Sequence, residues 1–250
     1  MDVKSLGNFV CDLPVRVGRR LRGEAADYRA FLFEDLKRRL AGRVPRRILE
    51  IGPKDGHDTR RLAGLGAEKI VLIDLPNQKN NIERWLPKLD SAPIELILGN
   101  FMYDPSFDGV EPFDLVWCTG VFYHNPEQLR FVRQLFDATA QDGLLVLESA
   151  TARRPGTRDE NCVEIWYPPD KATRKKVHLS ANVTHLPSAR AMESWLQMVG
   201  FDELERSTCH RRVTRSLSAN RAAFIARRAA AKSGVYYSIS GGDFPVGRAR

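Results

Sequence analysis

The sequence predicts an α/β fold in which a mostly parallel sheet carries helices on both of its faces. Short apolar runs bounded by turn residues alternate with segments whose apolar residues recur at helical spacing. Strand and helix alternate strictly through the first half of the chain, which predicts parallel strands joined by right-handed crossovers. The 250 residues suffice for one such domain with small additions.

The chain is expected to begin with an arm and a covering helix, which together make up residues 1–41. Residues 1–23 are irregular and basic. The helix is predicted over residues 24–40, because Leu32, Leu36 and Leu40 belong to an apolar stripe with charges opposite. Gly42 and Pro45 should end it.

The first predicted strand, residues 48–51, ends abruptly at a glycine turn. Gly52 and Gly56 let the backbone turn sharply and lie against a ligand. A helix over residues 57–64 and a strand over residues 70–73 follow, and Asp74 stands at the tip of that strand. This order is typical of a nucleotide-binding crossover, where the turn presents N–H groups and the acid accepts the ribose hydroxyls.

The turn lacks the three glycines that a pyrophosphate requires. The pattern is Glu50-x-Gly52-x-x-x-Gly56, with Lys54 where a middle glycine would be expected. An acid two residues before the first glycine suits a ligand with an ammonium and a sulfonium and would repel a pyrophosphate. A plain structural turn between strand and helix is the alternative.

The remaining elements continue the alternation. Helices are predicted over residues 82–89, 127–140 and 189–198, and strands over residues 94–98, 113–118 and 144–147. Residues 201–209 and 222–226 should form a closing strand pair. Sheet ligands sit beyond the carboxyl ends of the strands, so residues 119–125 should form part of the active-site rim.

A basic and aromatic insertion interrupts the domain, which is expected over residues 42–228. The insertion, residues 149–185, is expected to act as a lid. Arg154, Trp166 and Tyr167 are its candidate substrate-binding residues, because basic and aromatic side chains together could clamp a phosphate and stack on a ring. A solvated charged loop is the even alternative. Residues 229–250 form a basic C-terminal tail.

Composition narrows the partners and the setting of the chain. A formal net charge of +8 favours acidic partners such as nucleic acid, phosphorylated substrates or anionic lipid heads, without choosing among them. The four cysteines form no C-x-x-C pair, so neither a metal site nor a disulfide framework is expected. No apolar run approaches the ~20 residues of a membrane span, and the N-terminus is a poor signal peptide. A soluble, cytoplasmic protein is expected.

The glycine turn with its two acids resembles that of the class I S-adenosylmethionine-dependent methyltransferases. Further matches occur in order along residues 46–228, and together they look like the catalytic domain of the tRNA wobble-uridine carboxymethyltransferase family. These matches are Gly120-Val121-Phe122-Tyr123-His124, Leu147-Glu148-Ser149, Asp159-Glu160-Asn161, Leu186-Pro187-Ser188-Ala189, Trp195-Leu196, Gly200-Phe201 and residues 221–227. The resemblance implies a Rossmann-like class I methyltransferase fold with a mostly parallel, seven-stranded sheet.

The resemblance also implies which residues bind the cofactor. The candidates are Glu50, Gly52, Pro53, Lys54, Gly56, Asp74, Leu75, Asn100, Phe101, Thr119 and Gly120. Asn100 would bond the adenine amine and Phe101 would cover the ring. A turn asparagine followed by a core phenylalanine is an equally good interpretation of that pair.

Three residues are candidates for catalysis. His124 would act as the base for a hydroxyl or amine acceptor, and Tyr123 matches the family position that faces the cofactor. Glu148, at the end of the fifth strand, is a second candidate base or an acceptor of substrate hydroxyls. A histidine that merely begins a helix is the alternative for His124.

We therefore expect a methyltransferase that acts on an O or N nucleophile of a small molecule, a sugar or a secondary metabolite. An RNA methyl- or carboxymethyltransferase is the first alternative, and a non-catalytic scaffold that binds S-adenosylmethionine is the second. The segment before Arg46 is shorter than in the tRNA enzymes and looks unrelated to theirs. Ordinary S-adenosylmethionine is therefore expected as the cofactor rather than its carboxylated form.

Overall fold

The computed structural model describes residues 27–89, 93–104, 110–154, 160–166, 184–213 and 220–228. The N-terminal arm, the C-terminal tail, Tyr167 and most of the basic insertion lie outside these ranges. Among the described residues, no helix is long and apolar enough to cross a membrane.

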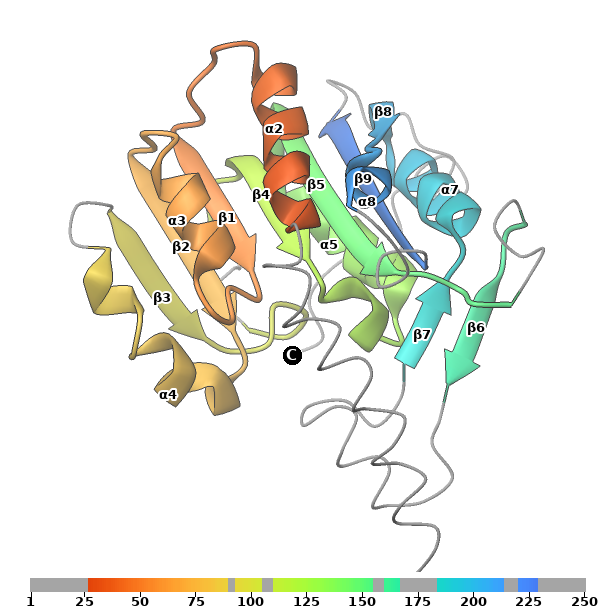
Figure 1. Cartoon of the computed structure of the whole chain (residues 1–250), viewed down its shortest axis with the longest axis horizontal. Helices are drawn as coiled ribbons and strands as arrows, with labels where there is room; N and C mark the ends of the chain where they lie inside the picture. The colour runs from red at the N-terminus through yellow and green to blue at the C-terminus, as the bar shows by residue number, and fades with distance from the viewer. Residues whose placement is uncertain are drawn as a thin grey trace, which may run out of the picture.

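A seven-stranded sheet in the order β3-β2-β1-β4-β5-β9-β8 organises the domain (Figure 1). β1 to β5 run parallel, and β9 is antiparallel to both of its neighbours. The strands are β1 (Arg47–Ile51), β2 (Lys69–Asp74), β3 (Ile94–Leu98), β4 (Phe113–Thr119), β5 (Thr139–Ala150), β6 (Val163–Trp166), β7 (Thr184–Pro187), β8 (Phe201–Arg206) and β9 (Arg221–Arg228). The predicted fold class, a mostly parallel seven-stranded α/β sheet, is confirmed.

Helices cover both faces of this sheet. The α-helices are α2 (Tyr28–Leu40), α3 (His57–Ala63), α4 (Lys79–Ile82), α5 (Gln128–Ala138), α7 (Ala189–Val199) and α8 (Cys209–Arg212). The larger apolar cluster joins one face of the sheet to α5 and α7. The other cluster joins the opposite face to α2, which lies in front of the sheet in Figure 1. Alternate residues of each central strand enter opposite clusters, which explains why the strands read as continuous apolar runs.

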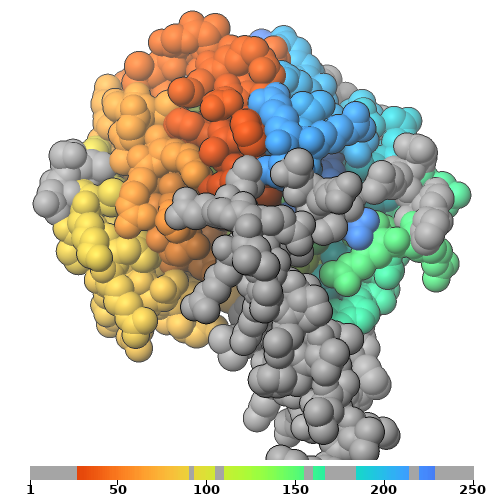
Figure 2. Space-filling model, viewed as in Figure 1, coloured from red at the N-terminus to blue at the C-terminus, as the bar shows by residue number. Residues whose placement is uncertain are grey.

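Helix α2 is fixed to the C-terminal half of the domain by a buried acid. The Asp35 carboxylate is fully buried and accepts hydrogen bonds from the Ser207 hydroxyl and the Arg212 guanidinium, both at 2.6 Å. Figure 2 shows α2 packed directly against the blue segment that contains α8. The N-terminal end of α2 lies at the carboxyl end of β4, where Arg29 pairs with Asp58 and lies beside Gly120.

Several elements differ from the sequence expectation. The helix predicted over residues 82–89 does not form: α4 ends at Ile82, and only a 3-10 turn, Leu86–Lys88, follows it. Pro87 lies inside that turn and disfavours an α-helix there. The predicted helix over residues 127–140 ends at Ala138, and β5 begins at Thr139, before Gly143. α8 was not predicted, and neither was the antiparallel pairing of β6 with β7 inside the insertion.

Candidate active site

The glycine turn and the acid at the tip of β2 lie together, as the sequence predicts. The backbone N–H of Gly52 donates to the Ile73 carbonyl at 2.9 Å. The Lys54 N–H donates to one oxygen of Asp74 at 3.3 Å, and the Leu75 N–H donates to the other at 2.8 Å. Burial raises the pKa of Asp74, and these two N–H donors act against the rise. Each oxygen keeps a lone pair for a further donor, such as a ribose hydroxyl.

Both glycines of the turn are required by their surroundings. Gly52 has φ +76° and Gly56 has φ +72°, in the left-handed region that disfavours side chains. A Cβ on Gly52 would overlap Val121 Cγ2, and a Cβ on Gly56 would lie 2.7 Å from Cζ3 of Trp85. Lys54 also has positive φ, +47°, and its side chain is exposed. The lysine thus adopts the backbone conformation of the glycine that it replaces.

The acid that precedes the turn is buried and poorly solvated. Glu50 is 2% exposed, and its Oε2 has no hydrogen-bond partner among the residues described. Burial, and secondly the charge of Asp58, raise the pKa of Glu50 to about 8. The carboxyl group is therefore protonated at neutral pH in the absence of a ligand.

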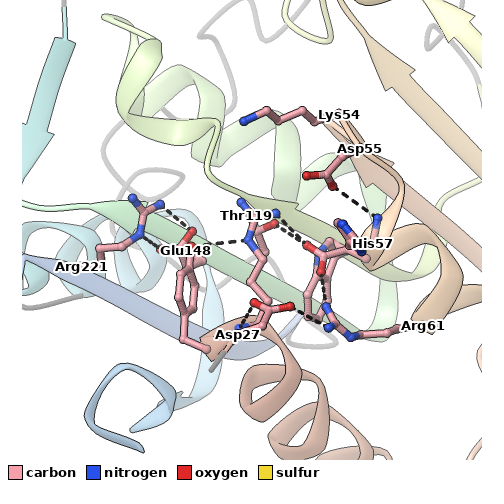
Figure 3. A network of polar contacts seen from close by, with 12 residues as sticks. Asp27, Lys54, Asp55, His57, Arg61, Thr119, Glu148 and Arg221 are labelled. Atoms are coloured by element: carbon pink, nitrogen blue, oxygen red, sulfur yellow. Dashed lines mark hydrogen bonds and ion pairs between the residues drawn. The ribbon is translucent and has the colours of Figure 1, made fainter. Parts of the chain in front are cut away.

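A second acid, Asp58, organises the carboxyl end of β4. Figure 3 shows the polar network of this region, with Arg61, Thr119 and Glu148 labelled. Its buried Oδ2 accepts hydrogen bonds from the Trp117 indole at 3.2 Å and from the Thr119 hydroxyl at 3.1 Å. Ion pairs at 3.2 Å with Arg29 of α2 and at 2.9 Å with Arg61 of α3 complete its partners. One carboxylate thereby joins two helices to the strand tip that carries Thr119 and Gly120.

Glu148 lies at the end of β5 and is held by Arg221 of β9. Glu148 is fully buried, and the guanidinium donates to both of its oxygens, in the second case at 2.9 Å. The Arg221 guanidinium also lies 5.6 Å from the ring centroid of Tyr123. The structure thus brings Tyr123 and Glu148 together through Arg221, which was not predicted as a site residue. A carboxylate paired in this way is a poor general base, so its role as a base stays a prediction.

Tyr123 and His124 occupy a 3-10 turn, Phe122–His124, which begins two residues after Gly120. Their rings lie 4.0 Å apart, and the His124 N–H donates to the Val121 carbonyl at 2.9 Å. The β6-β7 ribbon packs beside this turn. Trp166, at the end of β6, is 39% exposed, and Arg154 is exposed as well. Their predicted contact with substrate remains a prediction, as does the catalytic role of His124.

At the end of β3, the structure supports the alternative interpretation of Asn100 and Phe101. The Asn100 side chain accepts a hydrogen bond from the Met102 N–H at 3.0 Å, within its own turn. Phe101 is 3% exposed and packs edge-on against Phe131, with ring centroids 5.5 Å apart. The ring of Phe101 belongs to the core, which favours the alternative interpretation, and its predicted contact with adenine stays a prediction. Asn100 is exposed, so its predicted bond to adenine remains open.

Sequence analysis missed four residues of this region, namely Arg29, Asp58, Trp85 and Arg221. Arg221 begins the matched run 221–227 but was given no role at the site, and the other three belong to no motif. Their contacts depend on tertiary structure. Only the helical position of Asp58, two residues after Gly56, could have drawn attention to it. Within the described ranges, no group of three or more His, Cys, Asp or Glu side chains could hold a metal ion.

Comparisons with known proteins agree with this geometry. A curated tRNA U34 carboxymethyltransferase of Pseudomonas putida (strain W619) is 29% identical over 164 residues, which are 64% of this chain and 46% of that protein. The chain therefore spans about half the length of the curated relatives it matches.

Two solved structures share the fold. The N-terminal domain of EvdMO1, in the presence of SAH and D-fucose, has a TM-score of 0.60 at 20% identity and covers 83% of this chain and 85% of its own. The N-methyltransferase NodS from Bradyrhizobium japonicum WM9, in complex with S-adenosyl-L-homocysteine, has a TM-score of 0.56 at 19% identity and covers 85% and 96%.

A sequence model of one family also matches residues 18–205, well over half of the chain; its description is "Methyltransferase domain". The match includes the glycine turn, Asp74 and the strand tip at Gly120. The chain belongs to this methyltransferase-domain family.

Proposed function

We propose that the chain is an S-adenosylmethionine-dependent methyltransferase that transfers a methyl group to an O or N nucleophile of a small molecule. The observation that carries the proposal is the junction of the glycine turn with Asp74, through the Lys54 N–H at 3.3 Å. The turn offers bare backbone at Gly52, and the carboxylate offers acceptors for ribose hydroxyls. Family membership and the SAH in two structural neighbours support the choice of cofactor.

Methyl transfer from a sulfonium is an in-line displacement, so the enzyme mainly holds the nucleophile at near-attack distance from the methyl group. In this proposal Tyr123 faces the methyl group, and His124 accepts the proton that an O or N nucleophile loses. Glu148 and Arg221 fix the floor beneath Tyr123. Trp166 and Arg154 border the acceptor from the insertion.

Charge distribution favours a small acceptor over RNA. Acidic and basic side chains are almost equal in number among the described residues, so most of the +8 falls on other parts of the sequence. The described residues taken together therefore carry no strong basic excess, on which phosphate-backbone binding depends. Of the two structural neighbours, one was solved in the presence of D-fucose and the other is an N-methyltransferase.

Transfer of a methyl or carboxymethyl group to tRNA is the second candidate. The names of the curated relatives favour it. In that case carboxy-S-adenosylmethionine would be the matching cofactor, and the basic segments outside the described residues would supply the contacts to RNA.

Calorimetry tests the cofactor assignment. The parent protein should bind S-adenosylmethionine, and Asp74→Ala should weaken binding at least 10-fold through loss of charge-assisted hydrogen bonds to the ribose. Glu68→Ala is the matched control, because Glu68 is an exposed acid just before the opposite end of β2 and pairs only with Arg46. Absence of binding by the parent, or equal effects of the two substitutions, would overturn the proposal.

The acceptor class is tested by radiolabel transfer from methyl-labelled S-adenosylmethionine. Small-molecule fractions and total tRNA are offered in parallel at several salt concentrations. Label that enters small molecules, at a rate insensitive to salt, supports the first candidate. Label that enters tRNA, with a rate that falls steeply with salt, overturns it in favour of the second.

A further inference from the structure

Strand β6 has an open edge that faces away from the rest of the domain. It belongs to a two-stranded ribbon and lies beyond β7, at the outside of the molecule (Figure 1). The Ser188 N–H donates to the Cys162 carbonyl at 2.8 Å, so in this register the even-numbered residues of β6 make the hydrogen bonds to β7. The N–H and C=O groups of Val163 and Ile165 therefore point away from β7, and no described residue pairs with them.

The other edge of the ribbon is already occupied. The outward carbonyl of Pro187 accepts from the Ala152 N–H at 3.0 Å, and that of His185 accepts from the Gln128 side chain at 2.8 Å. Most of β7 is buried, whereas most of β6 is exposed. The ribbon is thus anchored to the domain through β7, and β6 is the side on which a further strand can add.

The side chains of β6 are apolar although they face solvent. Val163 is 37% exposed, Ile165 is 65% exposed and Trp166 is 39% exposed. The single charged residue of the strand, Glu164, accepts a hydrogen bond from the Arg153 N–H at 2.8 Å. An exposed strand edge with apolar side chains is a template for pairing with another chain.

The edge of the main sheet is built differently. β8 carries Asp202, Glu203 and Glu205, and its register with β9 shifts between Asp202 and Glu205. Charges and a shift of this kind are the usual devices that prevent strands from pairing edge to edge. The chain therefore protects β8 and leaves β6 without such protection.

We infer that β6 pairs with β6 of a second copy of this chain, antiparallel, about a two-fold axis at Ile165. A strand that pairs with its own copy makes an isologous contact, in which each residue meets the same surface on the other copy. At this axis the outward N–H of each Ile165 donates to the carbonyl of the other, and the two ribbons become one four-stranded sheet. The inference is independent of the cofactor and of the reaction.

Charge and proline positions select this axis among the neighbouring ones. An axis at Glu164 would place two carboxylates directly opposite each other, which is destabilising. An axis at Trp166 would place Val163 opposite position 169, a proline that has no N–H to donate. The axis at Ile165 places Glu164 opposite Trp166, so no like charges meet.

Pairing would also stabilise one wall of the candidate site. A two-stranded ribbon is marginally stable by itself, and further strands add to its stability. β7 packs beside the turn that carries Tyr123 and His124. A second copy seated on β6 would therefore hold the ribbon in place against this turn.

Sedimentation equilibrium of the full chain tests the association. The parent should exchange between monomer and dimer, and Ile165→Lys, which sets two like charges opposite each other, should raise the dimer dissociation constant at least about 10-fold. Val44→Lys is the matched control, because Val44 is another exposed aliphatic residue, at 58%, and lies outside the ribbon. This control should dimerise as the parent does.

Disulfide cross-linking tests the axis. Cys11 and Cys162 are first replaced by serine, so that only the buried Cys118 and Cys209 remain. Opposed residues of a hydrogen-bonded antiparallel pair have Cα atoms about 5.5 Å apart, within the reach of a disulfide. Ile165→Cys should therefore give a covalent dimer on mild oxidation. Val163→Cys should not, because its two copies would lie about 14 Å apart along the strands.

Each outcome decides the inference. A parent that stays monomeric at every concentration, or a dimer that Ile165→Lys and Val44→Lys affect equally, overturns it. Cross-linking through Val163→Cys instead of Ile165→Cys overturns it as well. A thermal melt of each variant identifies misfolding of Ile165→Lys, in which case the two cysteine variants decide.

Discussion

The indole N–H of Trp85 donates a 2.9 Å hydrogen bond to the carbonyl oxygen of Lys54, while the same ring fills the space beside Gly56. The Asn81 amide donates to this carbonyl as well, at 2.6 Å. The segment between β2 and β3 therefore holds the glycine turn from outside. The shape of the glycine turn therefore depends on two residues that lie 27 and 31 positions after Lys54 in the chain.

Replacement of Trp85 by phenylalanine should loosen this turn. The smaller aromatic ring still fills most of the space beside Gly56, but the bond to Lys54 is lost, at a cost of about 1 kcal/mol in the free energy of unfolding. Affinity for S-adenosylmethionine should fall several-fold, because the turn is less well ordered before binding. Denaturant unfolding measures the loss of stability, and calorimetry measures the affinity. Unchanged affinity would show that the hydrogen bond from Trp85 to Lys54 has no influence on the site.

Gly56 and Gly66 form a matched pair for the steric role of Trp85. Both have positive φ, but a Cβ on Gly66 meets nothing closer than 3.9 Å, whereas one on Gly56 would press into the indole ring. Gly66→Ala should cost about 1 kcal/mol from backbone strain alone. Gly56→Ala should cost a further 1–3 kcal/mol from overpacking. Equal losses in denaturant unfolding would argue against the contact with Trp85.

The buried Glu50 should make stability fall as pH rises. Burial, with the charge of Asp58, raises its pKa from 4.5 to about 8 in the folded protein. Between these values the folded state binds a proton that the unfolded state has released, so the free energy of unfolding declines with pH and is lowest above pH 8. Glu50→Gln should flatten the profile between pH 6.5 and 8, as followed by denaturant unfolding at each pH. A slope that survives the substitution would assign the effect to another group.

His210 should have the opposite effect in acid. Burial lowers its pKa from 6.5 to about 4, although the nearby Glu148 acts against this shift. Below pH 6.5 the unfolded state binds a proton that the folded state refuses, so stability is full above pH 6.5 and falls as the pH drops toward 4. His210→Phe keeps a ring against Tyr28, whose centroid lies 4.4 Å away. Melts of this variant should lose less stability between pH 6.5 and 4 than those of the parent.

Of the polar contacts that hold α2 to the rest of the domain, those of the buried Asp35 should be the most costly to remove. Asp35→Ala removes the acceptor of the buried Ser207 hydroxyl and an ion-pair partner of the partly exposed Arg212, for an expected loss of about 1–3 kcal/mol in unfolding free energy. Glu205→Ala removes only an exposed partner of Arg38 and should cost less than about 1 kcal/mol. Comparable losses in denaturant unfolding would contradict this order.

The central sheet was predictable because local and tertiary preferences agree there. Residues 94–98 were assigned to a strand with the bounds that β3 has, and β1, β2 and β4 differ by one or two residues. These strands are buried on both faces, so their apolar runs are continuous and end at turn residues. The contact of the glycine turn with Asp74 followed from the same order of elements.

The remainder of the site depends on contacts between distant segments. Nothing near Phe101 in the sequence distinguishes a ring that covers a ligand from one that packs on Phe131. Glu148 was selected for its place at a strand end, but its partner Arg221 lies on β9, the neighbouring antiparallel strand, which comes 73 residues later in the chain. The β6-β7 pairing joins residues 163–166 to residues 184–187 across a long basic stretch. That separation is too long for a hairpin signal, so the sequence predicted an irregular insertion.

Arg29 and Arg221 reach Gly120 from opposite ends of the described chain, one from α2 and the other from β9, the last strand described. During synthesis, α2 and the first five strands leave the ribosome well before β9. A nascent chain that has exposed only β1 to β5 already carries Asp74 and the glycine turn, yet the buried Glu148 still lacks its cationic partner. The ion pair that holds Glu148 and places Arg221 beside Tyr123 therefore forms only after β9 inserts between β5 and β8.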